Sequence, residues 1–334
     1  MSAPVSTREN LKQRLQQVTG DDLLRVHRVL EQQFRNPNAF VQELCEHVAR
    51  YQGKRIRPMI LLLSARMAGA DAAGMSVGVK LGAVVEMIHT ATLVHDDVID
   101  DADLRRHVST VHRRWNTETS VLLGDYLFSR AFHLAATTGD AEACRLIGRA
   151  TDRTCEGELN QIAARIEQST SERDYFRVIS GKTGQLFSVS CRLGGRVAGA
   201  SEKGMSHLRQ FGMRLGLAFQ IADDVLDLTE NSQTTGKDAA NDLNNHRLTL
   251  PLLRSLALGD DFERRKIRES LLSSDPADHQ RLRTSSVVQR GVESARQTAE
   301  ELVRRACRNL HFFPPSDSRD LLESIAMFSV VRSH

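Results

Sequence analysis

Two short acidic motifs, 127 positions apart (223 − 96), constrain this chain more than any other feature of its sequence. They are Asp96-Asp97-Val98-Ile99-Asp100 and Asp223-Asp224-Val225-Leu226-Asp227. Residues four apart lie on one face of an α-helix, so Asp96 lines up with Asp100, and Asp223 with Asp227. The sequence therefore predicts two paired carboxylates, each on a helix.

Each motif ends a stretch in which apolar residues recur at helical spacing, Leu81 to Val94 and Leu208 to Ala222. Clustered acids repel one another, and the helix dipole disfavours them at a C-terminal end. Bound Mg²⁺ would relieve both costs, because it prefers oxygen ligands and often bridges to substrate phosphates. A single motif of this kind is about as often a solvated acidic surface turn as a metal site. The second copy favours a metal site that binds a diphosphate.

Helical periodicity dominates the rest of the chain, and alternating patterns typical of β-strands are scarce. No internal repeat and no break in composition divides the sequence. We expect an all-α protein in which residues 21–334 form one large helical domain, preceded by a polar N-terminal extension over residues 1–20.

Composition excludes several classes of protein. The 45 basic and 42 acidic side chains nearly cancel to a net charge of +3, which gives no basic excess for binding nucleic acid. The five cysteines form no C-x-x-C pair, which argues against a disulfide framework or a zinc site and fits a cytoplasmic protein. The polar N-terminus does not resemble a signal peptide, and no run of about 18 apolar residues predicts a transmembrane segment.

Basic side chains gather at four places, in glycine-flanked segments or directly after the first motif. These are Gly53-Lys54-Arg55-Ile56-Arg57-Pro58, Leu104-Arg105-Arg106, Gly181-Lys182-Thr183-Gly184 and Gly236-Lys237-Asp238. Arginine binds phosphate as a rigid fork and lysine as a point charge, and glycine lets the backbone come close. Any one segment alone is usually ordinary surface. Together with two acid pairs, they favour diphosphate binding.

In these motifs the chain resembles the trans-isoprenyl diphosphate synthases, the polyprenyl synthetase family. The matching segments, in the family's order over roughly residues 40 to 260, are the four above, Glu86 to Asp100, Gly124 to Leu127, Phe219 to Asp227, Asp242-Leu243 and Thr249 to Pro251. The resemblance implies a helical bundle of the isoprenoid synthase type with a central active-site cavity.

The resemblance also implies roles for individual residues. Up to three Mg²⁺ ions would be held by Asp96, Asp100 and Asp223, supported by Asp97, Asp224 and Asp227. Lys182, Lys237 and Arg105 would neutralise the leaving diphosphate of an allylic substrate. Lys54, Arg57, His89 and Arg106 match positions that hold isopentenyl diphosphate, and Thr183 and Gln220 match polar contacts near the allylic group.

The implied reaction joins isopentenyl diphosphate to an allylic diphosphate and lengthens a trans-polyprenyl chain. The resemblance further implies a homodimer, with at most peripheral membrane contact when the apolar product leaves. Three departures from the family's pattern are His107 for glycine, Ser109 for proline, and His246-Arg247-Leu248 for glycine-lysine-proline. Arg247 preserves the charge, so we expect activity to be retained.

The small residues Ala91 and Thr92, five and four positions before Asp96, bear on product length. In the family, bulky aromatics there resemble a plug that stops short products. Their absence here favours a product longer than C20, of six or more isoprene units, over a short or medium chain such as geranylgeranyl. Phe128 or Phe132 could close the far end of the tunnel or be an ordinary core residue, and Phe132→Ala is expected to lengthen the product.

Two other readings stay open. A terpene cyclase of the same fold also uses an acidic metal motif, but it needs no isopentenyl site, so the segment from Gly53 to Pro58 and the second aspartate motif argue against it. A non-catalytic subunit of a heteromeric synthase commonly lacks some aspartates, and none is missing here.

Overall fold

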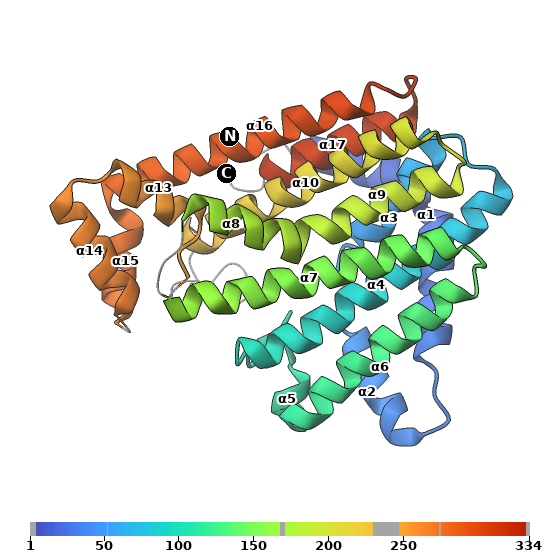
Figure 1. Ribbon diagram of the computed structural model, residues 1–334, viewed down its shortest axis with the longest axis horizontal. Coiled ribbons are helices and arrows are strands. Elements are labelled where there is room, and N and C mark those ends of the chain that lie inside the picture. Colours follow the sequence, from blue (N-terminus) through green and yellow to red (C-terminus); the bar gives the residue numbers. More distant parts are fainter. Residues whose placement is uncertain (1–4, 52, 168–170, 230–246, 274, 332–334) are drawn as a thin grey trace.

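The computed structural model describes residues 5–51, 53–167, 171–229, 247–273 and 275–331. Nearly all regular structure in these residues is helical, which confirms the all-α prediction (Figure 1). The helices are α1 (Val5–Phe34), α2 (Ala39–Ala49), α3 (Ile56–Met67), α4 (Ala72–Ile99), α5 (Val111–Arg114), α6 (Thr117–Ala136), α7 (Ala141–Glu167), α8 (Glu172–Ile179), the π-helical turn η1 (Ser180–Gly184), α9 (Gln185–Val197), α10 (Glu202–Thr229), α13 (Leu250–Leu258), α14 (Asp261–Leu272), α15 (Pro276–Thr284), α16 (Ser286–Leu310) and α17 (Asp317–Val331). A short hairpin of β1 (Leu104–Arg105) and β2 (Val108–Ser109) follows α4.

Helix α4 supplies apolar side chains to the core along most of its length. Leu81, Val84, Val85 and Ile88 are fully buried, as their helical spacing predicts. They pack in a cluster with side chains from α1, α3, α6, α7 and α9. Because burying one such side chain contributes about 1.5–3 kcal/mol, tertiary packing fixes the position of this helix.

By length and hydropathy alone, α4 is also a helix that could cross a membrane. In the bundle, however, 61% of its most apolar 18-residue window is buried. The apolar surface of α4 is therefore already covered largely by other helices of the same chain, as in the core helix of a folded domain.

The second long core helix, α10, packs against α9, α16 and α17. Its residues Leu208, Phe211 and Leu215 are fully buried, again at the predicted helical spacing. Helix α9 contacts both α4 and α10 and so lies between the two helices that carry the aspartate motifs.

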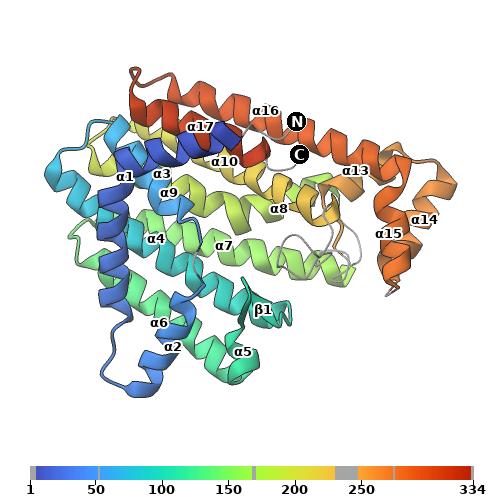
Figure 2. The ribbon, with the colours of Figure 1, turned by 180° about the vertical axis from the view of Figure 1, so that it is seen from behind.

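The C-terminal ends of α4, α7 and α10 lie at the same end of the bundle (Figures 1 and 2). Asp96 and Asp97 lie in the last turn of α4, with Asp100 as its C-cap, and the second motif lies in the last two turns of α10. This arrangement brings two motifs that are distant in the sequence to one end of the fold.

Helix α1 joins the N-terminal residues to the rest of the protein. Its Leu11, Leu15 and Val18 pack against the core, and Asp22 forms an ion pair with Arg66 of α3. A boundary after residue 20, between an extension and a domain, would fall inside this helix.

The hairpin after α4 has a two-residue turn of unusual composition. Leu104 pairs with Ser109 and Arg105 with Val108, and the intervening Arg106 and His107 have φ values of 51° and 65°. Two positive φ values define a type I′ turn, which favours Asn-Gly or Gly-Gly. His107 therefore bears a Cβ in a left-handed conformation that costs a non-glycine residue about 1–2 kcal/mol.

We predict that His107→Gly raises the free energy of unfolding by about 1 kcal/mol, because glycine adopts a positive φ without a clash. Equilibrium unfolding in urea measures the change. His107→Ala is the matched control and should give no such gain, because it keeps the Cβ. An alanine variant as stable as the glycine variant would contradict strain at this position.

Candidate functional site

Asp97 is the most deeply buried member of the first motif. It is fully buried, and Arg105 donates from Nε to its Oδ1 at 2.8 Å. Burial raises the pKa of Asp97 to about 6, Arg105 opposes that shift, and the neighbouring Asp96 and Asp100 add to it. Within the described residues its Oδ2 has no hydrogen-bond partner. One oxygen of this carboxylate is thus desolvated and has no hydrogen-bond partner among the described residues to offset that cost.

Asp96 and Asp100 each pair with a cation from another part of the chain. Lys182 of η1 places its Nζ 3.4 Å from Asp96 Oδ2. Arg247, in the segment before α13, forms a short ion pair with Asp100, and both side chains are largely buried. The repulsion within the first motif is therefore offset by cations that only the tertiary structure brings there.

In the second motif, Asp224 differs from its neighbours. It is buried, and its two oxygens accept hydrogen bonds from Tyr175 Oη at 2.6 Å and from Gln220 Nε2 at 2.8 Å. Asp223 and Asp227, one turn apart, are only partly buried. Asp224 is therefore suited to a structural role. Asp223 and Asp227 remain as the two carboxylates that share one face of α10.

A chain of contacts joins the two motifs. Thr183 donates to Gln220 Oε1 at 2.7 Å, and Gln220 donates to Asp224. Lys182, the residue before Thr183, faces Asp96. Two adjacent residues of η1 therefore link the first motif to the second through side-chain contacts.

Lys182 also contacts two residues that the sequence analysis missed. Its Nζ lies 2.8 Å from Glu158 Oε1 and donates to Gln161 Oε1 at 3.3 Å, both on α7. Burial alone would lower the pKa of Lys182, but Asp96 and Glu158 raise it, so the amine stays protonated. The spacing of Glu158 and Gln161, three residues apart and so on one face of a helix, was the available signal in the sequence.

A basic cluster lies beside the first motif. Burial lowers the pKa of Arg57 to about 10, which leaves it charged at neutral pH, and its guanidinium lies 4.9 Å from the centre of the Phe187 ring. Burial also lowers the pKa of His89 far below its usual value, with Arg57 and Arg106 adding to the effect. His89 is therefore neutral and can serve as a hydrogen-bonding group but not as a cation.

Glu86 is the acid within this cluster. Burial raises its pKa, while Arg57, Arg55 and Arg106 oppose the shift. Arg106 is held by a hydrogen bond from Nη1 to the carbonyl oxygen of Tyr51 at 2.6 Å. One carboxylate among several cations leaves a net positive region, which suits a second diphosphate.

Two further predicted cations are Lys54 and Lys237. Lys54 is exposed, three residues before Arg57. Lys237 lies outside the described residues.

The residues predicted to set product length differ in their surroundings. Ala91 is fully buried, and Thr92 is partly buried and donates to the carbonyl oxygen of His89. Phe128 packs against both the cluster that contains Ala91 and the cluster that contains Ile88. Phe132 is 36% exposed on α6, which argues against the role predicted for it, because an exposed ring cannot close an apolar tunnel within one copy.

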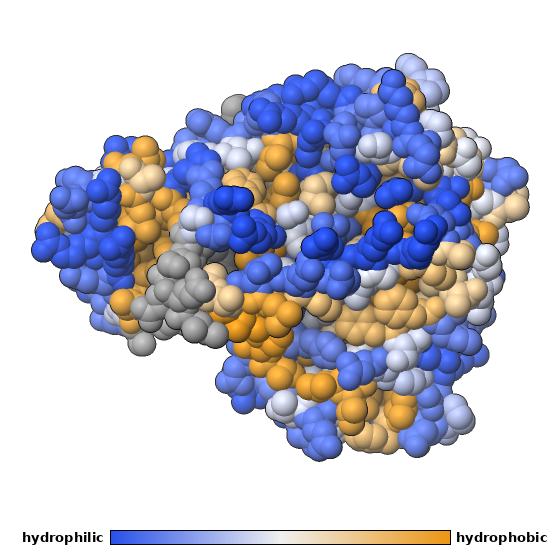
Figure 3. All heavy atoms as spheres, viewed as in Figure 1, coloured by the Kyte–Doolittle hydropathy of each residue, from blue (hydrophilic) through white to orange (hydrophobic). Residues whose placement is uncertain are grey.

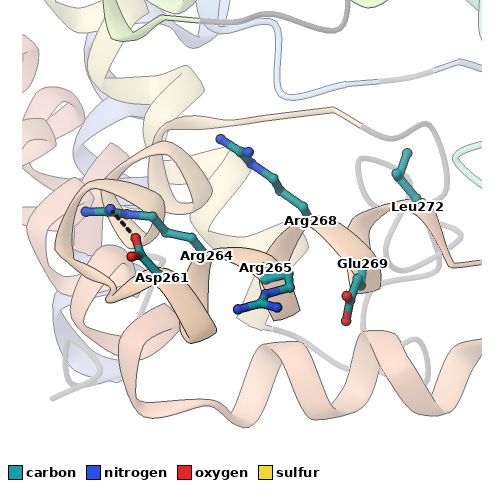
Figure 4. A pocket seen from close by; sticks show the side chains of 6 residues that line it. All are labelled: Asp261, Arg264, Arg265, Arg268, Glu269 and Leu272. Atoms are coloured by element: carbon teal, nitrogen blue, oxygen red, sulfur yellow. Dashed lines mark hydrogen bonds and ion pairs between the residues drawn. The ribbon is translucent and has the colours of Figure 1, made fainter.

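A groove of about 400 Å³ lies elsewhere, on the surface of α14 (Figure 4). Its six lining residues are all exposed: Asp261, Arg264, Arg265, Arg268, Glu269 and Leu272. Asp261 and Arg264 form a surface ion pair there, the kind of contact that contributes little energy. We assign this groove no ligand.

The aspartate site suits a hard divalent cation. Its oxygen donors are carboxylates, the ligands that Mg²⁺ and Ca²⁺ prefer, and one of them, the Oδ2 of Asp97, has no hydrogen-bond partner among the described residues. Since burial without a partner is costly for such an atom, a bound cation would satisfy it.

Comparison with known proteins identifies relatives of this chain. The model of the family described as polyprenyl synthetase matches residues 38–287. The octaprenyl diphosphate synthase of Haemophilus influenzae is 32% identical over 321 residues, covering 96% of this chain and 97% of that protein. The all-trans-nonaprenyl-diphosphate synthase (geranyl-diphosphate specific) of Rhodobacter capsulatus is 34% identical, covering 88% and 90%.

Solved structures are similar over almost the whole chain. The polyprenyl synthase from Caulobacter crescentus CB15, in complex with calcium and isoprenyl diphosphate, is 35% identical with a TM-score of 0.90, covering 96% of this chain and 98% of that one. A decaprenyl diphosphate synthase from Rhodobacter capsulatus is 34% identical with a TM-score of 0.87, covering 96% and 99%. The chain belongs to the polyprenyl synthetase family of prenyltransferases.

Proposed function

We propose that this protein is a Mg²⁺-dependent synthase that condenses isopentenyl diphosphate with an allylic diphosphate to make a trans-polyprenyl diphosphate longer than C20. The observation that carries the proposal is the chain of contacts from Asp96 through Lys182 and Thr183 to Gln220 and Asp224. This chain of contacts supports a single site that both aspartate motifs border.

In this proposal, Asp96, Asp100 and Asp223 hold the ions, and Asp97 and Asp227 support them. Bound Mg²⁺ would supply positive charge to the diphosphate oxygens and so stabilise the leaving group. Asp224 acts through its bonds to Tyr175 and Gln220, which hold α10 against α8 and η1.

Lys182 and Arg105 add protein cations on the leaving diphosphate, and Lys237 is proposed for the same role. The allylic C–O bond breaks and its electron pair leaves with the diphosphate, which gives an allylic cation. The double bond of isopentenyl diphosphate then attacks this cation, and a neighbouring proton passes to the released diphosphate. The buried helices around Ala91 and Ile88 keep water away from the cation.

The second diphosphate is assigned to the cluster of Arg57, Arg106 and the neutral His89, with Lys54 at its exposed side. Glu86 offsets part of the charge of these arginines before the substrate binds. Product length is assigned to the tunnel along α4, beginning at Ala91 and Thr92. The octaprenyl and nonaprenyl synthases among the relatives support a long product.

We predict that the protein, given Mg²⁺, farnesyl diphosphate and labelled isopentenyl diphosphate, incorporates label into products longer than C20, and that a chelator abolishes this. Asp96→Asn should lower kcat/KM about 100-fold or more, because it removes charge from the metal site. Asp261→Asn, on the exposed α14 groove, is the matched control. The measurement is chromatography of the dephosphorylated products.

Each competing reading predicts a different result in this assay. A cyclised hydrocarbon would indicate a terpene cyclase, and no incorporation would indicate a non-catalytic subunit. Products that stop at C15 or C20 would contradict the proposed length.

We predict that Phe128→Ala lengthens the product, because Phe128 contacts both apolar clusters along α4. Phe132→Ala is the comparison and should leave the product unchanged, since that ring is partly exposed. The distribution of dephosphorylated chain lengths decides between them. Lengthening by Phe132→Ala alone would restore the role predicted for Phe132 from the sequence.

A homodimer located in the cytoplasm is also part of the proposal. The five cysteines are all free, as a reducing compartment requires. Val121 and Leu122 are exposed apolar residues on α6. Figure 3 shows apolar patches on the lower part of one face of the molecule, where α6 lies. A second copy would bury these side chains.

We predict that Leu122→Glu converts the dimer to a monomer, because it would place a charge in an apolar interface. Sedimentation velocity over a range of concentrations measures the change. Leu258→Glu, at another exposed apolar position, on α13, should not alter the association state. Persistence of the dimer in the Leu122→Glu variant would exclude α6 as the interface.

A further inference from the structure

Lys182 lies in a part of the backbone with unusual geometry. Residues Ser180–Gly184 form one π-helical turn between α8 and α9. Such turns are rare, insert an extra residue into the helix, and are frequent at functional sites because they reorient side chains. Here the turn presents Lys182 toward α4 and Thr183 toward α10.

This turn is in direct backbone contact with α7. A Cβ added to Gly157 would lie 2.5 Å from the backbone nitrogen of Lys182, and one added to Gly181 would lie 2.7 Å from the carbonyl oxygen of Arg153. Only glycine fits at both places. Thr154 adds a hydrogen bond from Oγ1 to the carbonyl oxygen of Gly181 at 3.3 Å. The contact fixes the position of Glu158, the residue after Gly157, relative to Lys182.

Glu158 uses both of its carboxylate oxygens on Lys182. Its Oε1 and Oε2 lie 2.8 Å and 2.9 Å from Nζ, whereas Asp96 Oδ2 lies at 3.4 Å. The ammonium group of Lys182 has three donor hydrogens. It donates to Glu158 and Gln161, and these two bonds hold it against α7. Asp96 contributes attraction at a longer distance.

This geometry matters once divalent ions bind at Asp96, because they would repel an ammonium group that had Asp96 as its only anionic partner. We propose that Glu158 is a positioning residue, which anchors the ammonium group of Lys182 where the diphosphate of the allylic substrate binds. The inference rests on the proposed function and deepens it. Glu158 acts through Lys182, because both of its oxygens are already committed to that side chain.

A double-mutant cycle tests this role. The measured quantity is the dissociation constant of inorganic pyrophosphate at saturating Mg²⁺, by titration calorimetry, for wild type, Glu158→Gln, Lys182→Gln and the double variant. Each single variant should bind about 10- to 100-fold more weakly. The double variant should bind no more weakly than Lys182→Gln, since residues that act through one another give non-additive effects.

The matched control is Glu156→Gln, an exposed acid on the same helix that pairs with Arg153, and it should bind pyrophosphate as the wild type does. If the Lys182 variants fail to fold, steady-state kinetics of Glu158→Gln alone test the inference. This variant should raise KM for the allylic diphosphate and lower kcat, but leave KM for isopentenyl diphosphate unchanged. A structural defect would change both KM values together.

Losses that add in the double variant would overturn the inference, since they would make Glu158 a direct ligand of the metal or the diphosphate. Equal changes in both KM values would also overturn it. A wild-type protein that neither binds pyrophosphate with Mg²⁺ nor incorporates isopentenyl diphosphate would instead defeat the proposed function itself.

Discussion

The structure depends on cations that compensate the charge of three carboxylates at the C-terminal end of the buried helix α4. Asp96, Asp97 and Asp100 repel one another, and the dipole of α4 adds to the cost. Cations from three separate elements offset that cost: the hairpin, η1 and the segment before α13. The local sequence around α4 is therefore unfavourable by itself and becomes stable only when the whole bundle has formed.

Helix α4 contributes both to the hydrophobic core and to the candidate site. Its apolar positions are buried in the core, which fixes the helix, and its last turn presents the acids. Rigid packing of this kind holds a binding constellation more accurately than a loop would. The same apolar positions border the path proposed for the growing chain, so core packing and water exclusion are properties of one surface.

The sequence predicted the helices, the two acid motifs and the buried positions Leu81 to Ala91, because these follow from spacing along the chain. It did not reveal the partners of the acids. Glu158 and Tyr175 bond to residues 24 and 49 positions away, and such pairs depend on how helices pack. The same limit explains why the exposure of Phe132 was not predicted. Helical periodicity does not show which face of α6 contacts solvent or another copy. His107 is the reverse case, where the hairpin register imposes a conformation that the residue type disfavours.

The departure at Arg247 follows from the same charge balance. Its guanidinium is largely buried against Asp100. A guanidinium is planar, always charged and less strongly hydrated than an ammonium group, so it loses less on leaving water. It can therefore balance the charge of Asp100 before any metal arrives. Lys182 is the corresponding cation at Asp96, and it also pairs with Glu158. If ions and diphosphate bind as proposed, a phosphate oxygen would replace a carboxylate as the partner of each cation, and no buried charge would be left without a partner.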